Sequence, residues 1–403
     1  MHRALNVEEL RLKIISFLNK KDHTALLLLS KSFRQTLRPI TMLNLSITQK
    51  HLDACWTYCS GKTLADPAHS FRTATIDLAV SPGDILYFLG KCKVDSVTNL
   101  RVENSNALVK DNEYLDIAIV EICAKFTSVK DIEITGMGEG LQGEILGSFG
   151  NLVHLTIHIP IERSMSFPTL ILQQLNTLVV VDLESHGQTK SIAFSSLAAR
   201  IVAPNLEKLS IIGGFRTNLI PIRELVRRYR TTVVELSLLD EEGPDVDWHV
   251  MSFPQMPRLH TLVLDISWAG VYVNSENQFQ DSLPVLRSII LQAEQSKVYG
   301  GLIRSQWRKL ADGLRLVQNR LEMLQCDIRG DWEDLIESFI ANIRERLEEI
   351  GTDAGTIPIR EGTLASQWPE PAHLLAPRRK SVKKRAWTSG WGDVGSVVSG
   401  GSQ

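Results

Sequence analysis

The sequence predicts an α/β chain in which a short helical module precedes a long array of repeated strands and helices. Three observations lead to this prediction. The 403 residues are too many for one ordinary core, an apolar pattern L-x-x-L-x-L recurs through the middle, and helically spaced segments separate its copies. We therefore expect a helical module over residues 1–45, a repeat solenoid with a capping helix over 46–350, and a disordered basic tail over 351–403.

The N-terminal module is the first element, and its apolar residues follow helical spacing. Leu10, Ile14, Phe17 and Leu18 mark one helix, and the run Leu26–Leu29 leads a second helix after a break at residues 19–22. Two helices this short cannot bury such faces alone. They are therefore expected to pack on the repeats or on a partner protein.

The same stretch resembles an F-box. The pattern of that family is an acidic residue and Leu, an I-F/I-S-F/Y-L helix, a turn ending in Asp, a Leu-rich helix and S/C-K-x-F-R. The matching residues are Glu9, Leu10, Ile14, Ile15, Ser16, Phe17, Leu18, Asp22, Leu26, Leu28, Ser30, Lys31, Phe33 and Arg34. The opening nine residues look most like fungal F-box proteins. The sequence departs from the family at Glu8, where a proline is usual, and at His23 and Thr24, where a leucine pair is usual, and no Trp ends the module.

The resemblance implies a role in protein degradation. In this family the F-box helices insert into the adaptor subunit of an SCF (cullin–RING) ubiquitin ligase, and the repeats that follow hold the protein substrate. The chain would then be a substrate-recognition subunit that reaches cullin through the adaptor and performs no chemistry itself. The adaptor contacts that the resemblance implies are Leu10, Ile14, Phe17, Leu18, Leu26, Leu28 and Phe33. The alternative is a repeat scaffold without a ubiquitin role, in which these helices cap the solenoid.

The repeats are the second element, and each contains three apolar anchors in the pattern L-x-x-L-x-L. The anchors are Val97/Leu100/Val102, Val129/Ile132/Ile134, Leu152/Leu155/Ile157, Leu175/Leu178/Val180, Leu206/Leu209/Ile211, Val233/Leu236/Leu238, Leu259/Leu262/Leu264, Leu286/Ile289/Leu291 and Leu321/Leu324/Cys326. A weaker tenth case, Thr73/Ile76/Leu78, precedes them. The last two anchors of each set are two residues apart, so they point to one side of a short strand. Stacked strands of this kind form a parallel sheet with the anchors in its core.

The anchor spacing resembles that of leucine-rich repeats, which measure roughly 20–29 residues. Several intervals here are longer, which requires insertions. Regular members of the class carry Asn or Cys three residues after the last anchor. Those positions hold Ser105, Met137, Pro160, Leu183 and Gly214, so the resemblance is to irregular repeats.

Helices are expected between the strands, on the convex side of the solenoid. Residues 114–126, 221–230 and 305–320 place apolar side chains at helical spacing. Residues 331–350 do the same and precede Gly351, which is typical of a helix end. This last helix is interpreted as the C-terminal cap.

The concave strand surface is the expected substrate site, because the residues flanking the last two anchors face away from the core. Its first half is polar and its second half is apolar, a mixture that suits a peptide or domain of both characters. The candidates are Arg101, Glu103, Asp131, Glu133, His154, His158, Val179, Val181, Ile212, Leu239, Val263 and Ile290. The alternative is that loops cover the apolar half.

No motif favours an enzyme, and neither a cofactor nor a metal is expected. Gly138, Gly140 and Gly143 match G-x-G-x-x-G, but too few residues follow them for the helix of a dinucleotide fold before the next strand begins. His51, Cys55 and Cys59 share a helix face but lack a fourth zinc ligand nearby. We therefore predict no catalytic residues.

Charge is unevenly distributed along the chain. Residues 1–50 carry +6 and residues 351–403 carry +3, so the net charge of −2 leaves −2 − 6 − 3 = −11 for the middle. An acidic body does not favour nucleic acid. The basic cluster 377–385 is either a nuclear-import signal or a solvated charge run. No apolar run approaches a membrane span, so the protein is expected in the cytoplasm, the nucleus or both, without an obligate homo-oligomer.

Overall fold

A computed structural model describes residues 44–48, 71–90, 92, 94–104, 113–137, 139–158, 169–182, 200–213, 215–239, 254–265, 282–294, 321–329, 341–346, 348–349 and 359–362. The chain divides into two compact units, Met1–Gly362 and Thr363–Gln403, and every described residue belongs to the first. The predicted module up to residue 43, the predicted helix 305–320 and the basic cluster 377–385 therefore lie outside the described residues.

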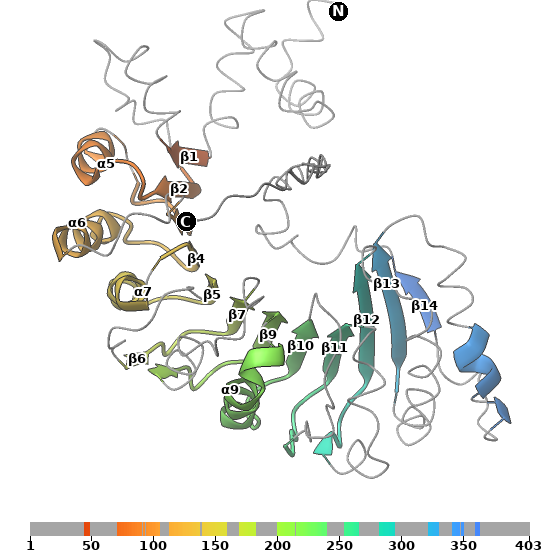
Figure 1. Cartoon of the computed structure of the whole chain (residues 1–403). Coiled ribbons are helices and arrows are strands. Elements are labelled where there is room, and N and C mark those ends of the chain that lie inside the picture. Colours follow the sequence, from red (N-terminus) through yellow and green to blue (C-terminus); the bar gives the residue numbers. More distant parts are fainter. Residues whose placement is uncertain are drawn as a thin grey trace, which may run out of the picture. The chain divides into compact units, whose positions relative to one another are not determined.

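The first unit is built on one large parallel sheet (Figure 1). Its strands, in spatial order, are β1 (Asn44–Ile47), β2 (Thr73–Asp77), β3 (Asn99–Glu103), β4 (Asp131–Thr135), β5 (His154–His158), β7 (Thr177–Asp182), β9 (Lys208–Gly213), β10 (Glu235–Leu239), β11 (Thr261–Asp265), β12 (Ser288–Glu294), β13 (Met323–Arg329) and β14 (Ile359–Gly362). Spatial order therefore follows chain order. Two short strands, β6 (Leu170–Ile171) and β8 (Ile201–Val202), pair separately. The predicted α/β class with a parallel sheet is confirmed.

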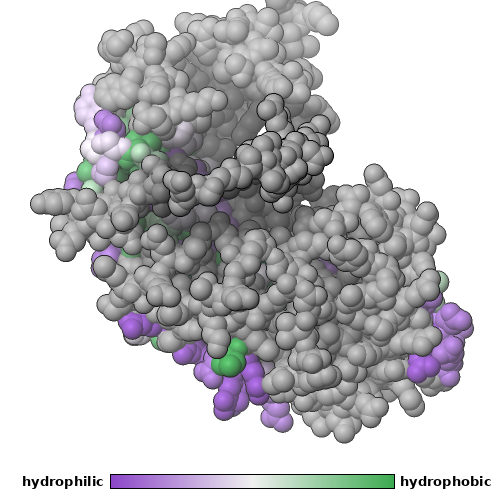
Figure 2. All heavy atoms as spheres, in the orientation of Figure 1, coloured by the Kyte–Doolittle hydropathy of each residue, from purple (hydrophilic) through white to green (hydrophobic). Residues whose placement is uncertain are grey.

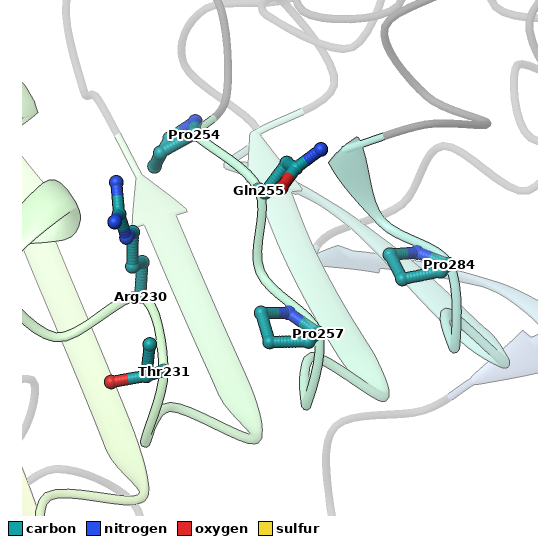
Figure 3. Close-up of a pocket in the computed structure, with 6 residues that line it drawn as sticks. All are labelled: Arg230, Thr231, Pro254, Gln255, Pro257 and Pro284. Atoms are coloured by element: carbon teal, nitrogen blue, oxygen red, sulfur yellow. The ribbon is translucent and has the colours of Figure 1, made fainter.

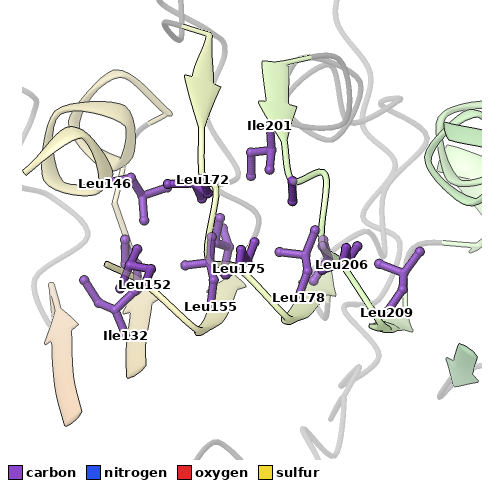
Figure 4. Packing of buried hydrophobic residues seen from close by; sticks show 14 of the residues in the cluster. Ile132, Leu146, Leu152, Leu155, Leu172, Leu175, Leu178, Ile201, Leu206 and Leu209 are labelled. Carbon is purple, nitrogen blue, oxygen red and sulfur yellow. The ribbon is translucent and has the colours of Figure 1, made fainter. Parts of the chain in front are cut away.

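The strand register aligns the predicted anchors. The second anchors are paired in one continuous row from Leu100 through Leu178 to Leu324. Every member of the first eight triplets, together with Leu321 and Leu324 of the ninth, is at most 4% exposed. A one-residue slip of any strand would turn its anchors to the other face, so this burial fixes the register. Figure 4 shows Ile132, Leu155, Leu178 and Leu209 of successive strands side by side in the core.

A row of carbonyl groups joins the strands at the point where each begins. Each of these carbonyls accepts two backbone N–H groups from the next strand, at N···O distances of 2.7–3.1 Å. For example, the Val153 carbonyl accepts from Asn176 and Thr177. The carbonyls belong to Arg72, Thr98, Lys130, Val153, Asn176, Glu207, Val234, His260 and Arg287. This pattern repeats nine times and satisfies the backbone donors at the strand starts.

A further buried residue in most repeats was missing from the sequence prediction. It lies three residues before the first anchor, and in five repeats its carbonyl accepts the anchor's N–H at 3.1–3.3 Å, which closes a turn. These residues are Val94, Phe126, Phe149, Leu172, Ala203, Met256 and Leu283, and each is at most 6% exposed. Their apolar character at a fixed offset was visible in the sequence, so the repeat has four anchors.

The helices that connect the strands all bury side chains in the same core as the anchors. They are α5 (Pro82–Leu89), α6 (Glu113–Ala124), α7 (Glu139–Gly147) and α9 (Phe215–Arg228). Helix α6 packs against α5 and α7, and α7 contacts β6. Ile85, Ile122, Ile145 and Leu225 of the four helices join the anchor cluster. The helices therefore cover the anchor face of the sheet (Figure 1).

The two predicted helices in the described region are present, with one shifted start. Helix α6 matches the predicted range 114–126. Helix α9 begins at Phe215, before the predicted start at Pro221, so this proline lies inside the helix and not in its first turn. A proline within a helix lacks the N–H that bonds the preceding turn. Of the predicted cap 331–350, residues 341–346 are helical and Ile343 is fully buried, while residues 331–340 lie outside the described residues.

Three boundaries differ from the sequence prediction. The register pairs Ala74 with Leu100 and Ile76 with Val102, so the weak tenth triplet is correctly Phe71/Ala74/Ile76 and not Thr73/Ile76/Leu78. Strand β1 begins inside the predicted module, which extended to residue 45. Strand β14 lies in the segment that was predicted to be a disordered tail. The repeat pattern did not predict this strand, because its third anchor position holds the charged Glu361 where the pattern has an apolar residue.

Gln142 of α7 ties two repeats together. Its side chain is fully buried, and its Nε2 donates to the carbonyls of Met137 at 3.3 Å and His158 at 3.0 Å. The Met137 carbonyl lies just after β4, and the His158 carbonyl belongs to the last residue of β5. Regular leucine-rich repeats carry an Asn near this position. The Gln142 amide therefore satisfies buried acceptors of two neighbouring repeats.

Replacing Gln142 with Leu should lower the free energy of unfolding by about 1–3 kcal/mol, because two carbonyls lose their donor. Chemical denaturation measures this. Ser148→Ala removes an exposed hydrogen bond at the end of the same helix, where Ser148 donates to the Glu144 carbonyl, and should change stability by less than about 0.5 kcal/mol. An equal effect of the two substitutions would contradict a tie through Gln142.

Candidate binding face of the sheet

The face of the sheet opposite the anchors is called the outer face here. Alternation along each strand places the residues between and beside the anchors on it. Its middle row pairs Arg101 with Glu133, Thr156, Val179 and Ser210, and continues to Ile290. All twelve residues predicted for the concave surface lie on this face, and β3–β5 carry the six polar ones.

Six of these residues form a charged patch, namely Arg101, Glu103, Asp131, Glu133, His154 and His158. Arg101 Nε lies 3.0 Å from Glu103 Oε2, and Arg101 Nη1 lies 3.7 Å from Glu133 Oε1. His158 Nε2 lies 3.4 Å from the same Glu133 oxygen. One guanidinium and one imidazole therefore meet at one carboxylate, across three strands.

The second part of the charged patch lies at the strand starts. His154 Nδ1 lies 2.5 Å from Asp131 Oδ1, and these residues face each other directly in the register. Asn99 Nδ2 donates to Asp131 Oδ2 at 2.7 Å. Directly opposed groups of complementary character stabilise a strand pair by roughly 0.2–1 kcal/mol. The contacts also hold the Asp131 carboxylate in one orientation.

The apolar half of the predicted site is largely closed. Val181 and Val263 are each 1% exposed, Ile290 is 7% exposed and Ile212 is 9% exposed. None of the four belongs to the main core cluster on the anchor face. Val179 and Leu239 are half-buried. A partner can therefore reach the outer face at the charged patch more readily than at these four side chains.

A shallow groove of about 510 Å³ was not anticipated from the sequence. It lies where the chain enters β10, β11 and β12, between successive turns (Figure 3). Its lining residues are Arg230, Thr231, Pro254, Gln255, Pro257 and Pro284. The prolines hold the turn backbone, and Arg230 is the only ionisable residue among the described ones that line the groove.

The described surface is otherwise polar, with few large apolar side chains. Tyr87, Ile171, Val202 and Ile220 are the exposed ones, and Ile171 and Val202 are paired across β6 and β8. In Figure 2, green marks only small areas of the described surface in view. Among the described residues, no helix is both long and apolar enough to cross a membrane.

Two groups with raised pKa values have structural explanations. Burial raises the pKa of the Cys123 thiol to about 12, so this cysteine stays protonated and is a poor nucleophile. Burial also raises the pKa of Tyr229, whose hydroxyl donates to the Ile201 carbonyl at 2.7 Å. Among the described residues, no three His, Cys, Asp or Glu side chains are grouped as metal ligands. His51, Cys55 and Cys59 lie outside that region.

The described glycines of the G-x-G-x-x-G match lie in a helix and not in a turn at the end of a strand. Gly140 and Gly143 lie within helix α7, and Gly138 is outside the described residues. The turn that leaves β4 uses Gly136, with φ of 73°. The predicted adaptor contacts between Leu10 and Phe33 also lie outside the described residues.

Comparison with known proteins gives no family assignment. No family model matches the chain, and no curated protein is significantly similar to it.

Proposed function

We propose that this chain is the substrate-recognition subunit of an SCF-type ubiquitin ligase. In this proposal residues 9–34 dock on the adaptor, and the outer face of the sheet binds the protein substrate. The observation that carries the proposal is the combination of an F-box-like stretch with a repeat sheet on whose outer face the side chains of Arg101, Glu103, Asp131 and His154 are at least 26% exposed. The subunit would act by holding its substrate near the ubiquitin-carrying enzyme, which raises the effective concentration of the substrate.

The sheet itself is proposed to be an irregular leucine-rich-repeat solenoid. Three features support this: in-register anchors, carbonyls that accept two N–H groups at each strand start, and strands that follow chain order. Stacking of successive units is how a repeat protein buries a continuous core. The Asn position of regular repeats is missing, and Gln142 supplies comparable hydrogen bonds at one repeat.

Co-expression with the SCF adaptor tests the proposed function. The full chain should be captured by the tagged adaptor, and Leu18→Asp combined with Leu26→Asp should abolish capture, because a carboxylate would enter an apolar contact. Asn19→Asp places the same charge in the predicted turn and should leave capture intact. Failure of the unaltered, soluble chain to be captured would overturn the proposal.

A scaffold without a ubiquitin role is the second candidate, and the position of β1 favours it. Leu45 and Ile47 of β1 are buried in the sheet core, so the sheet begins within the residues that the sequence assigned to the N-terminal module. Deletion of residues 1–43 separates the two candidates. In the scaffold, residues 1–43 are a cap that the repeats need for solubility. Precipitation of the shortened chain, together with no adaptor capture of the full chain, would therefore support the scaffold.

A further inference from the structure

We infer that α9 and the groove beside it bind a short acidic segment of a partner protein. The site combines an arginine stripe, defined as Arg223, Arg227 and Arg230, with the groove at the starts of β10–β12. Helix α9 packs on the anchor face of the sheet, so this site is separate from the charged patch. The inference does not rest on the proposed function.

The arginine stripe occupies one face of α9 and continues into the turn after it. Starting from Ile220, the intervals to Arg223, Arg227 and Arg230 are three, four and three residues, which keeps side chains on one face of a helix. All three arginines are exposed, and Ile220 is 73% exposed. The opposite face is buried in the core through Ile222, Leu225, Val226 and Tyr229. The stripe is therefore held toward solvent by the packing of the helix.

The guanidinium groups of the stripe are unpaired within the described part of the chain. None of the three forms an ion pair with another described residue, whereas Nη1 of the neighbouring Arg228 donates to the Ile201 carbonyl at 3.3 Å. A helix C-terminus favours cations, which accounts for Arg227 in the last turn. It does not account for Arg223, one turn earlier, or for Arg230, beyond the helix end.

Charge selects an acidic partner. The exposed charged residues within 220–231 and 254–258 are five arginines and one glutamate, which gives +5 − 1 = +4. Residues 51–350 as a whole carry −11, so this surface is a local exception. Complementary potentials steer association and exclude partners of the same sign. A guanidinium also pairs with a carboxylate through two parallel hydrogen bonds.

The groove extends the arginine stripe. Arg230 belongs to both, and in Figure 3 its side chain extends toward Pro254. The three prolines give the groove apolar walls, and Thr231 and Gln255 add hydrogen-bonding groups. Its volume of about 510 Å³ lies within the range of roughly 300–1,000 Å³ that is usual for ligand pockets. A segment whose carboxylates meet the stripe can therefore place an apolar side chain in the groove.

The surroundings of the stripe favour a protein segment over a membrane or a nucleic acid. The apolar face of α9 is used in the core, so the helix cannot insert it into a lipid surface. A long polyanion would also meet the acidic body of the chain. Arg223 and Arg227 are about 6 Å apart along the helix, close to the roughly 6.7 Å between alternate residues of an extended peptide. Acidic residues at alternate positions would therefore meet successive arginines.

Fluorescence anisotropy with the full chain tests the inference. The probe is a labelled nonapeptide of alternating Glu and Ser that ends in Leu, compared with the same peptide carrying Gln in place of Glu. The Glu peptide should bind at least about tenfold more tightly, and its affinity should fall as the salt concentration rises. Equal affinity of the two peptides would overturn the inference.

Matched double substitutions locate the site. Arg223→Gln with Arg227→Gln should weaken binding of the Glu peptide about four- to twentyfold, because two ion pairs are lost. Both positions are exposed, so the variant should remain folded, which circular dichroism checks. Arg378→Gln with Arg379→Gln removes the same charge from the basic cluster 377–385 and should leave affinity unchanged. An equal or larger loss from this control would contradict the assignment to α9.

A charge placed in the groove tests its part in the site. Gln255→Glu should weaken binding of the Glu peptide about two- to fivefold, because the new carboxylate repels the segment. Gln173→Glu makes the same change at an exposed position before β7 and should have no effect. Equal effects of the two substitutions would remove the groove from the site.

Two other anionic probes test the class of partner. They are a single-stranded oligonucleotide of matched charge and vesicles that contain phosphatidylserine. Both should bind more weakly than the Glu peptide. Tighter binding of either probe, lost in the Arg223→Gln/Arg227→Gln variant, would overturn the assignment to a protein segment.

Discussion

Leu262→Ala should lower the free energy of unfolding by about 3–5 kcal/mol, the largest effect expected for a single substitution in the sheet. Leu262 is fully buried in β11 and pairs in the register with Leu236 and Ile289. Truncation removes apolar contacts and leaves a cavity that the two neighbouring strands cannot both move to fill. Urea denaturation followed by circular dichroism gives the change.

Thr261→Ala is the matched control for this prediction. Thr261 precedes Leu262 on the same strand but lies half-buried on the outer face. Its truncation should cost less than about 1 kcal/mol. If the two substitutions cost the same, the anchor side of β11 would be misassigned.

Gly136→Ala should lower the free energy of unfolding by about 2–4 kcal/mol, because two unfavourable terms add. Gly136 has φ of 73°, a left-handed conformation that costs other residues roughly 1–2 kcal/mol. A Cβ there would also lie 2.6 Å from the Asn104 carbonyl oxygen. That oxygen belongs to the backbone of the preceding repeat, so it cannot rotate away.

Gly147→Ala in the same repeat should have the opposite sign. Gly147 is the last residue of α7, and a Cβ added there meets nothing within 4 Å. Alanine lowers the conformational entropy of the unfolded chain, so stability should rise by about 0.4–1 kcal/mol. Loss of stability from Gly147→Ala comparable to that from Gly136→Ala would show that the repeat tolerates no added methyl group.

The sheet could be predicted from the sequence because each strand is marked by residues that lie close together along the chain. In each repeat, three apolar residues such as Leu206, Leu209 and Ile211 mark where the strand lies. Only one strand register buries all three of them. The prediction misplaced the anchors of β2 and missed β14, because the anchor positions of these strands are not all large and apolar. Ala74 is small and Glu361 is charged, yet both occupy anchor positions in β2 and β14.

The candidate site was only partly predictable, since the register sets the face but not its exposure. Strand alternation places Arg101, Asp131 and His154 on the outer face. The strand register then explains which side chains they contact. The burial of Val181 and Val263 depends on tertiary packing, which a local sequence pattern does not predict. The described glycine with a positive φ after β4 is Gly136, which does not belong to the motif.

Light scattering during size-exclusion chromatography tests most directly whether this chain is an SCF substrate receptor. The full chain has a mass of 45.1 kDa and would be mixed with the purified adaptor. We predict one peak whose mass equals one chain plus one adaptor, and separate peaks for the Leu18→Asp/Leu26→Asp variant. Separate peaks for the folded, unaltered chain and the adaptor would contradict the proposed function.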